Sequence, residues 1–346
     1  MILSVHLYRR DMTPYEKSFH VAEFELGVDE INADATSTFT LPEDFLVERG
    51  DWLRAKYYPS GKQAYFGVVE SQENRTIHCR GLLGLADSEI MTHRVKGNSF
   101  EAHARKLILD NLVNDSTKNL SRVLDVQVES NTAHSYQADG IGSRKLNSYL
   151  VNGFKKYNIK WAIKDVQNKK IFSVMRRVTK QISIKDSSSE FRNWDVYIKK
   201  PGSGTENKLI IVDEASKNME APNILATYYL INDAVTTNAN HKEILKPTVT
   251  KIYLYDRTLE DAPTYLEVAQ SELSGNSYSH EISFDIDMHS KNIDFESLET
   301  GMLATLYVKG QVLKSVLTAY RVSSDSNAFS VTFGNVRSRT RDYFDE

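Results

Sequence analysis

Two stretches near opposite ends of the chain follow one pattern, Val47-Glu48-Arg49-Gly50-Asp51-Trp52-Leu53 and Leu298-Glu299-Thr300-Gly301-Met302-Leu303. After each come a strand pattern, a glycine (Gly61 or Gly310), a second strand pattern and a third glycine (Gly81 or Gly334). The matching glycines are 251, 249 and 253 residues apart. Because a turn glycine can adopt positive φ, matched glycines indicate matched hairpins. The pattern predicts two copies of a small β-barrel, at 1–92 and 245–346, although any two unrelated β-meanders also share glycines at their turns.

Most of the sequence between these glycines alternates apolar and polar residues with period two. Such runs, rich in Val, Ile, Thr, Tyr and Phe and bounded by turn residues, are typical of half-buried antiparallel strands. The fold class is therefore expected to be mainly β. The expected strands are Ser18–Leu26, Thr36–Leu41, Trp52–Tyr58, Ala64–Val69, Arg75–Cys79, Asp195–Ile198, Leu209–Val212, Ala226–Ile231, Thr250–Tyr255, His280–Ile286, Leu303–Val308 and Phe329–Phe333.

The region 93–176 differs and is expected to be an inserted α+β domain. Asn98 followed by Glu101 is a weak capping box before a helical apolar stripe, and a second helix is expected from Ser143. A hairpin around Gln167-Asn168 follows. The remaining segment, 177–244, is expected to return as β structure and connect the insert to the second barrel.

Composition limits the possible functions. The chain has 346 residues, a net charge of -3 and one cysteine, Cys79. A single thiol rules out an internal disulfide framework and a zinc site built from several cysteines. The sequence contains no run of about 18 apolar residues, so no membrane span is predicted. The N-terminus lacks the charge and apolar pattern of a signal peptide.

Four groups of residues are candidates for chemical sites. His78-Cys79, with His93 nearby, suggests a thiol nucleophile, but neighbouring strand positions face opposite sides of a sheet. Gly140-Ile141-Gly142 before Ser143 suggests an anion site at a helix N-terminus, for which a plain turn is the alternative. Asp285, Asp287, His289 and Glu296 have part of the spacing of a calcium loop but lack its glycine, since Ser290 stands there. Paired carboxylates such as Asp213-Glu214 and Glu260-Asp261 are too common to imply acid–base chemistry. We therefore expect no catalytic, cofactor-binding or metal-binding residues, no cofactor and no enzymatic activity.

Residues 143–180 carry an uneven charge. Eleven cations stand against Asp165, a local excess of +10 that leaves -13 for the rest of the chain. Three interpretations stay open: a solvated or subunit-facing surface, a contact with an acidic partner, and binding of DNA or an anionic cell-wall polymer. The cations are Arg144, Lys145, Lys155, Lys156, Lys160, Lys164, Lys169, Lys170, Arg176, Arg177 and Lys180.

The C-terminal motifs resemble those of a known family. Leu298–Met302, Tyr320-Arg321-Val322 and Phe329–Gly334 followed by Asn335-Val336-Arg337 are similar to the end of the hub region in siphophage tail-associated proteins of Gram-positive hosts. The N-terminal barrel, with an insertion opening near Ser99-Phe100-Glu101, is similar too. The baseplate hubs of contractile phages and the spike base of type VI secretion share this fold.

The resemblance implies a structural hub at the virion tail tip. It implies a homotrimer below the distal tail ring, whose six barrels form a pseudo-sixfold annulus in contact with the tail tube, the tape-measure protein and receptor-binding proteins. The genome would pass through its central channel, with no membrane insertion by the hub itself. Relatives often carry a lytic or fibrous extension; because this sequence stops at Arg337–Glu346, a short hub without a lysin, or one whose extension was removed, is expected. A peptidoglycan hydrolase and a host-glycan-binding adhesin are the alternatives.

Overall fold

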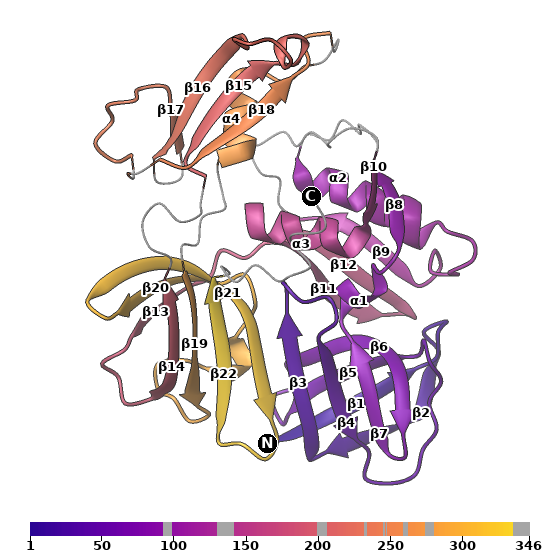
Figure 1. Cartoon of the computed structure of the whole chain (residues 1–346). Coiled ribbons are helices and arrows are strands. Elements are labelled where there is room, and N and C mark those ends of the chain that lie inside the picture. The colour runs from indigo at the N-terminus through magenta and orange to yellow at the C-terminus, as the bar shows by residue number, and fades with distance from the viewer. Residues whose placement is uncertain are drawn as a thin grey trace.

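One large sheet of 13 strands is built from both ends of the sequence. The computed structural model describes residues 1–92, 99–129, 142–198, 206–231, 234–244, 246, 248–258, 262–273 and 280–334. We call the N-terminal half of the sheet module 1 and the half made from later strands module 2, and they lie side by side (Figure 1). Module 1 holds β1 (Ile2–Tyr8), β2 (Pro14–Val21), β3 (Glu23–Asp29), β4 (Thr36–Thr40), β5 (Trp52–Tyr58), β6 (Gln63–Glu73) and β7 (Thr76–Arg80). Module 2 holds β13 (Gln181–Lys185), β14 (Phe191–Ile198), β19 (His280–Asp287), β20 (Leu303–Val308), β21 (Gln311–Ser323) and β22 (Ala328–Gly334).

The two modules share one strand order. Module 1 runs β3-β4-β7-β6-β5 and module 2 runs β14-β19-β22-β21-β20, with every neighbouring pair antiparallel. The second hairpin carries a bulge at the same place in both, between Val69 and Ser71 and between Leu317 and Ala319. A bulge re-aims a strand and increases its twist, so matched bulges give the modules matched curvature.

Two of the three glycine pairs are equivalent in conformation. Gly50 and Gly301 both have φ of 93°, and Gly61 and Gly310 have φ of 73° and 74°. The third pair is not equivalent. Val69 pairs with Cys79 and Leu317 pairs with Phe333, which aligns Gly334 with Arg80 rather than with Gly81. Gly334 has φ of 74°, whereas Gly81 has φ of −70°.

The expected closed barrels are not seen. Among the described residues the strand order is an open path from β14 to β2, from which β20 and then β13 branch at β21, and no pairing returns either module onto itself. Instead, Ala319–Ser323 of β21 pairs with Glu25–Asp29 of β3, which joins the modules edge to edge. The edges that would close a barrel are thus used, in part, to connect the modules. One expected strand was also wrong, because Ser18–Leu26 divides at Ala22 into β2 and β3.

The insert is an α+β unit between β7 and β13. Its three-stranded mixed sheet has the order β11-β12-β9, with β11 antiparallel and β9 parallel to β12. This sheet packs beneath two helices (Figure 1). The elements are α1 (Leu82–Leu85), β8 (Glu89–Thr92), α2 (Phe100–Ile108) continued by a π-helical turn (Leu109–Val113), β9 (Leu124–Val128), β10 (Gly142–Lys145), α3 (Leu146–Tyr157), β11 (Ile159–Gln167) and β12 (Lys170–Arg177).

The helix boundaries differ from those expected. The cap of α2 is Ser99, whose Oγ accepts a hydrogen bond from Ala102 N at 3.2 Å, while Asn98 lies outside the described residues. The second helix begins at Leu146 rather than Ser143, because Gly142–Lys145 pairs with β8. The hairpin around Gln167-Asn168 is present, with Asn168 and Lys169 at positive φ.

A separate four-stranded sheet stands apart from the modules. Its order is β17-β16-β15-β18, one face packs against a helix, and its core is its own cluster (Figure 1). We call residues 206–273 the distal unit. Its elements are β15 (Lys208–Asp213), a 3₁₀ turn (Glu214–Ser216), β16 (Ile224–Ile231), β17 (Ala234–Thr236), β18 (Thr250–Tyr255) and α4 (Tyr265–Leu273). The strands of 177–244 therefore divide between the large sheet and this one.

Candidate functional site: the junction of the insert with both modules

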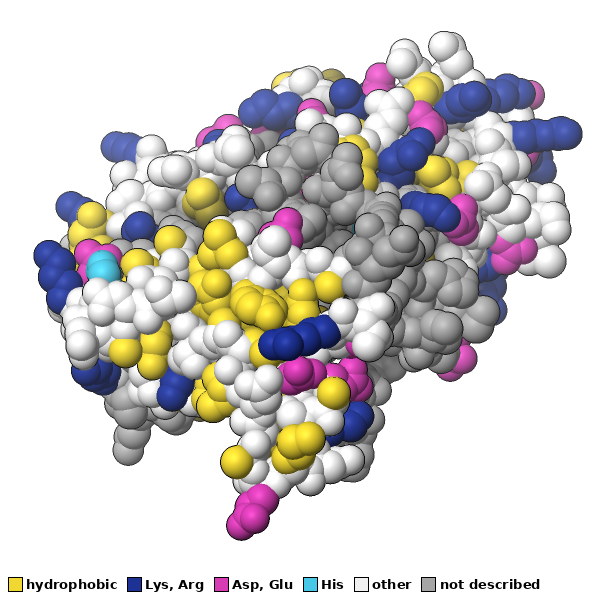
Figure 2. Space-filling model, turned by 90° about the horizontal axis from the view of Figure 1, so that it is seen from above, with side chains coloured by type: hydrophobic (Ala, Val, Ile, Leu, Met, Phe, Trp, Pro, Cys, Tyr) yellow, Lys and Arg dark blue, Asp and Glu magenta, His cyan; other side chains and the backbone are white. Residues whose placement is uncertain are grey.

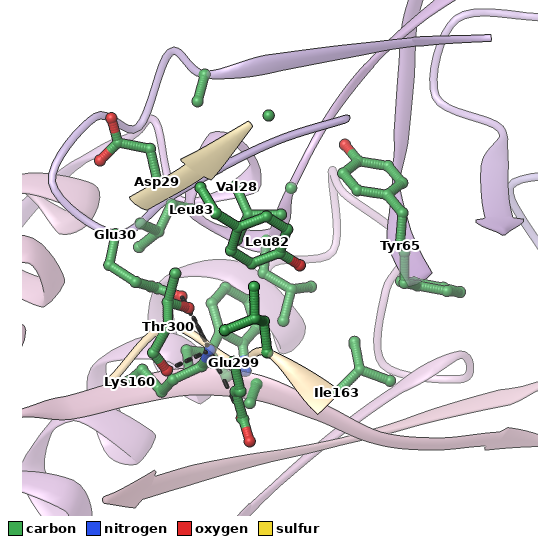
Figure 3. Close-up of a pocket in the computed structure, with 18 of the residues that line it drawn as sticks. Val28, Asp29, Glu30, Tyr65, Leu82, Leu83, Lys160, Ile163, Glu299 and Thr300 are labelled. Atoms are coloured by element: carbon green, nitrogen blue, oxygen red, sulfur yellow. Dashed lines mark hydrogen bonds and ion pairs between the residues drawn. The ribbon is translucent and has the colours of Figure 1, made fainter. Parts of the chain in front are cut away.

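A cavity of about 380 Å³ lies where the insert meets the seam between the modules. Its wall comes from the end of β3, the start of β6, α1, β11 and the turn before β20. In Figure 3, Leu82, Leu83 and Ile163 line its apolar part, and Glu30 and Glu299 lie around Lys160. The cavity thus lies where module 1, module 2 and the insert meet.

Lys160 is the centre of a buried polar network. The Lys160 side chain, on β11, is 9% exposed, and its Nζ lies 3.1 Å from Glu30 Oε1 and 3.7 Å from Glu299 Oε1. It donates to Thr300 Oγ1 at 2.7 Å and to Thr300 O at 3.2 Å, and Thr300 Oγ1 donates to Glu30 Oε1 at 2.7 Å (Figure 3). Glu30 directly follows β3 and Thr300 precedes β20, so one cation of the insert binds both modules. A buried charge with several hydrogen-bonding partners holds a defined geometry, because losing one partner leaves the others unpaired.

Further contacts strengthen this junction. Arg176 of β12 forms an ion pair with Glu299 and lies 3.9 Å from Glu129. Asn158, in the left-handed conformation after α3, donates from Nδ2 to Gly301 O at 2.9 Å. Lys180 donates to Ser297 O at 2.8 Å. Four side chains, Arg176, Asn158, Lys180 and Lys160, therefore bind residues 297–301 at this turn.

The matching turn of module 1 has a matching contact. Arg10 donates to the carbonyl of Arg49, the residue before Gly50, just as Lys160 donates to the carbonyl of Thr300 before Gly301. A positive-φ turn leaves its carbonyl without a partner in the hairpin ladder, and a cation satisfies it. The repeat thus extends from the backbone to the side chains that bind it.

Much of the basic stretch is neutralised within the chain. Besides Lys160 and Arg176, Lys145 pairs with Asp87 at 2.8 Å and Lys156 pairs with Glu272 of the distal unit at 3.5 Å. Arg177 donates to Tyr157 O at 2.8 Å. On the face shown in Figure 2, Lys and Arg side chains are spread out with Asp and Glu side chains between them. For Lys145, Lys156, Lys160 and Arg176, the acidic partner expected from the sequence is therefore a carboxylate of the same chain.

The thiol suggested by the sequence is buried. Cys79 lies in the core at 0% exposure, and burial, with a smaller contribution from Glu70, raises the pKa of its thiol well above the ordinary value. A thiol held in its protonated form is a poor nucleophile. His78 is half-buried on the alternate position of β7, and His93 lies outside the described residues.

The carboxylates with calcium-like spacing bind donors of the chain. Asn193 Nδ2 donates to Asp285 at 2.7 Å, Arg192 pairs with Asp287 at 3.1 Å, and Glu296 lies 3.8 Å from Lys62. No group of three or more His, Cys, Asp or Glu side chains that could hold a metal occurs among the described residues. Of the glycine motif, only Gly142 is described, and it begins β10. No helix in the described part of the chain is long and apolar enough to cross a membrane.

His103 and His280 are buried, and neither was a candidate site residue in the sequence. Burial lowers the pKa of His103 to about 4, with a smaller effect of Lys106, and burial lowers the pKa of His280 to about 4. His103 Nδ1 lies 2.6 Å from Tyr149 Oη, which fixes α2 against α3. Both imidazoles are therefore neutral core groups near pH 7.

Comparison with known proteins gives matches in structure alone. No family model matches the sequence, and no curated protein matches it. Prophage tail protein gp18 from Listeria monocytogenes EGD-e superposes with a TM-score of 0.54 at 11% identity, over 99% of this chain and 97% of that chain. The MuSo2 prophage 43 kDa tail protein from Shewanella oneidensis gives 0.52 at 10% identity, over 96% and 98%. A tail protein from Neisseria meningitidis MC58 gives 0.51 at 10% identity, over 96% of each chain.

The chain has a phage tail-protein fold. The resemblance seen in the sequence is confirmed at this level, over nearly the whole length of each solved structure. At identities of 10–11% the likeness is one of fold, and it carries over no residue of a site.

Proposed function

We propose that this protein is a non-enzymatic structural hub of a phage tail tip, assembled as a homotrimer. The observation that carries the proposal is the repeated module: β3-β4-β7-β6-β5 and β14-β19-β22-β21-β20 have the same pairings and the same bulge. Two equivalent modules in each chain give a threefold assembly six similar units. Such a ring can match a sixfold tube on one side and a threefold tip on the other.

The seam within the chain supplies the template for the ring. β21 pairs with β3 across the two modules, and repetition of that seam between chains would cover the free edge of β14, which ends the strand order of the sheet. The insert and the distal unit stand on one side of the modules (Figure 1). We place the tail tube and distal tail ring at the modules, with the tape-measure protein and genome passing through the channel and receptor-binding proteins at the periphery.

Release of the genome would be a movement rather than a chemical step. In this proposal the tip stays closed until the host is recognised, and the subunits then move apart as rigid bodies at their contacts. The saturated hydrogen bonding of Lys160 supports this, because the junction holds the insert in place on both modules of its own chain.

The test is the mass and symmetry of the purified protein. Multi-angle light scattering should give three protomers of 39.4 kDa each, alone or on addition of the ring partner. Electron-microscopy averages down the axis should show threefold symmetry with six similar peripheral densities. A stable dimer contradicts the proposal. Clearing of Gram-positive cell walls in a zymogram would instead support a hydrolase, and wall-polymer binding would support an adhesin.

A further inference from the structure

The seam between the modules of one chain has two components. The first is the strand pair of β21 with β3, in which Arg321 lies opposite Gly27 and Tyr320 opposite Val28. The second is the β5–β6 hairpin, which meets the turn before β20. There Lys62 Nζ lies 3.3 Å from Asp294 and 3.8 Å from Glu296, and the Tyr57 and Phe295 rings are 5.4 Å apart edge to face.

Each module also carries the other half of such a seam. By the shared register, β14 of module 2 corresponds to β3, and the β20–β21 hairpin corresponds to the β5–β6 hairpin. The outer part of β6, at Ser71–Glu73, corresponds to Ala319–Arg321 of β21. Asp44-Phe45 stands in module 1 where Asp294-Phe295 stands in module 2. One chain therefore contains two complementary half-seams besides the complete one.

These half-seams are separated within the chain. β14 ends the strand order of the large sheet, several strands away from β6. In Figure 1 β14 lies at the left of the molecule and β6 at the right. They can meet only if they belong to different copies.

We propose that β14 and the β20–β21 hairpin of one copy bind the outer part of β6 and the Asp44–Leu46 turn of the next. The occupant of this surface is a second copy of the chain, because the complementary surface is on the same chain in a register that the seam specifies. This inference rests on the proposed ring and names the residues that build it. The contact is heterologous, and it closes once six modules, supplied by three chains, complete the turn.

The exposed apolar side chains favour this assignment. Leu46 is 86% exposed, Val312 is 62% exposed and Tyr197 is 44% exposed, although large apolar residues are usually covered. Leu46 stands where module 2 has the two residues Glu296-Ser297, and Gln311-Val312 corresponds to Lys62-Gln63. At the second seam Gln311 thus stands where Lys62 stands at the first, so the cation of the ion pair is missing. The exposed Leu46 and Val312 would instead lose their contact with water when a second copy binds.

The register predicts specific pairs of residues. Carrying Arg321 opposite Gly27 over to the second seam puts Glu73 opposite Tyr197, and Gln72 opposite Ile198. Directly opposed residues in antiparallel strands have Cα atoms about 4.5–5.5 Å apart, which suits a disulfide. Cys79 is fully buried, so it does not compete for the introduced thiols.

The experiment is oxidation of a variant with both Glu73→Cys and Tyr197→Cys in the full chain. We expect a non-reducing gel to show linear dimer and trimer and then a closed trimer, with no larger species. An equimolar mixture of the two single variants should stop at a covalent dimer. The matched control combines Glu73→Cys with Met219→Cys, since Met219 is 62% exposed but lies on the distal unit, outside β14 and the β20–β21 hairpin, and it should not cross-link.

A second variant tests the apolar contact. Leu46→Asp should weaken each contact between copies by at least about tenfold, the effect of placing a charge where a leucine is buried. Met219→Asp, at a residue 62% exposed on the distal unit, should leave assembly unchanged. Circular dichroism should show both variants folded.

The outcomes separate the two proposals. A trimer by light scattering that gives no Glu73–Tyr197 cross-link and is insensitive to Leu46→Asp overturns this interface but leaves the hub standing. A ladder that continues past three chains also overturns it. A chain that stays monomeric and uncross-linked, with or without its ring partner, overturns both.

Discussion

Replacing Lys160 with methionine removes the charge at the centre of the junction while keeping most of the side-chain volume. Glu30 and Thr300 then lose their shared donor in a site where the Lys160 and Glu30 side chains are 9% and 10% exposed. Removing one partner of a buried ion pair costs about 3–5 kcal/mol. Because Glu299 keeps Arg176, we expect the lower end, about 3 kcal/mol.

The assay is urea denaturation followed by circular dichroism and tryptophan fluorescence, since Trp161 lies in the insert core beside the junction. The matched control is Lys164→Met on the same strand, an exposed lysine that should change the free energy of unfolding by less than about 0.5 kcal/mol. Adding Glu30→Gln to Lys160→Met should recover part of the loss, because it removes the uncompensated carboxylate. Equal effects of Lys160→Met and Lys164→Met would refute the view that this cation holds the insert to the modules.

Three further predictions concern the repeat, the insert and pH. Gly50→Ala and Gly301→Ala should each cost about 1–2 kcal/mol of unfolding free energy, because both have φ of 93°, while Gly81→Ala, which has open space around it, should cost much less. Unequal losses at Gly50 and Gly301 would count against equivalent turns. Gly153→Ala should destabilise by about 1–3 kcal/mol, because its Cβ would lie 1.8 Å from Phe100 Cζ, and the exposed Asn152→Ala on the same helix is the control; a neutral Gly153→Ala would mean that α2 and α3 are not in close contact. For His280 the folded pKa of about 4 lies below the unfolded value near 6.5, so the unfolded state binds more protons between them, and stability is lost as pH falls from about 6.5 towards 4. His280→Gln should flatten the dependence of unfolding free energy on pH in that window, and an unchanged slope would show that this histidine is not protected from protonation.

Much of the sheet could be predicted from the sequence, because its strands bury one face. Trp52–Tyr58, Thr250–Tyr255 and Leu303–Val308 were expected with the bounds they have in the structure. Period-two alternation marks such strands even when their partners are unknown. The pairing between modules was not predictable in this way, because alternation specifies a face and says nothing about which edge meets which.

The missed elements have physical reasons. Helix α4 was not expected, yet Thr264 and Glu267 form a capping box, in which Glu267 Oε2 accepts from Thr264 N at 2.7 Å and Thr264 Oγ1 accepts from Glu267 N at 3.3 Å. That Thr-x-x-Glu spacing was a usable signal. The second helix was expected to begin at Ser143, just before the apolar stripe that starts at Leu146, but Gly142–Lys145 pairs with β8 and is extended.

The positive charge of residues 143–180 is a case in which composition alone does not predict what the cations bind. An excess of +10 over a short stretch is typical of a surface that binds a polyanion. Here Lys160 is buried against Glu30, Lys156 meets Glu272, and Lys145 meets Asp87. These acids lie 58 to 130 residues away along the chain, so no local pattern could identify them.

The proposed seam between copies would differ in chemistry from the seam within one chain. Within one chain the modules are covalently linked, so Lys62 meets Asp294 at high effective concentration and a partly exposed ion pair is sufficient. Copies that must find one another in solution have no such advantage, and a salt-screened surface pair would contribute little to their association. In the proposed interface the exposed Leu46, Val312 and Tyr197 would supply a contact that does not weaken with salt. If that reasoning holds, raising the ionic strength should leave the covalent-trimer yield of the Glu73→Cys/Tyr197→Cys variant unchanged, and a yield that falls steeply with salt would show that charge, not apolar burial, brings the copies together.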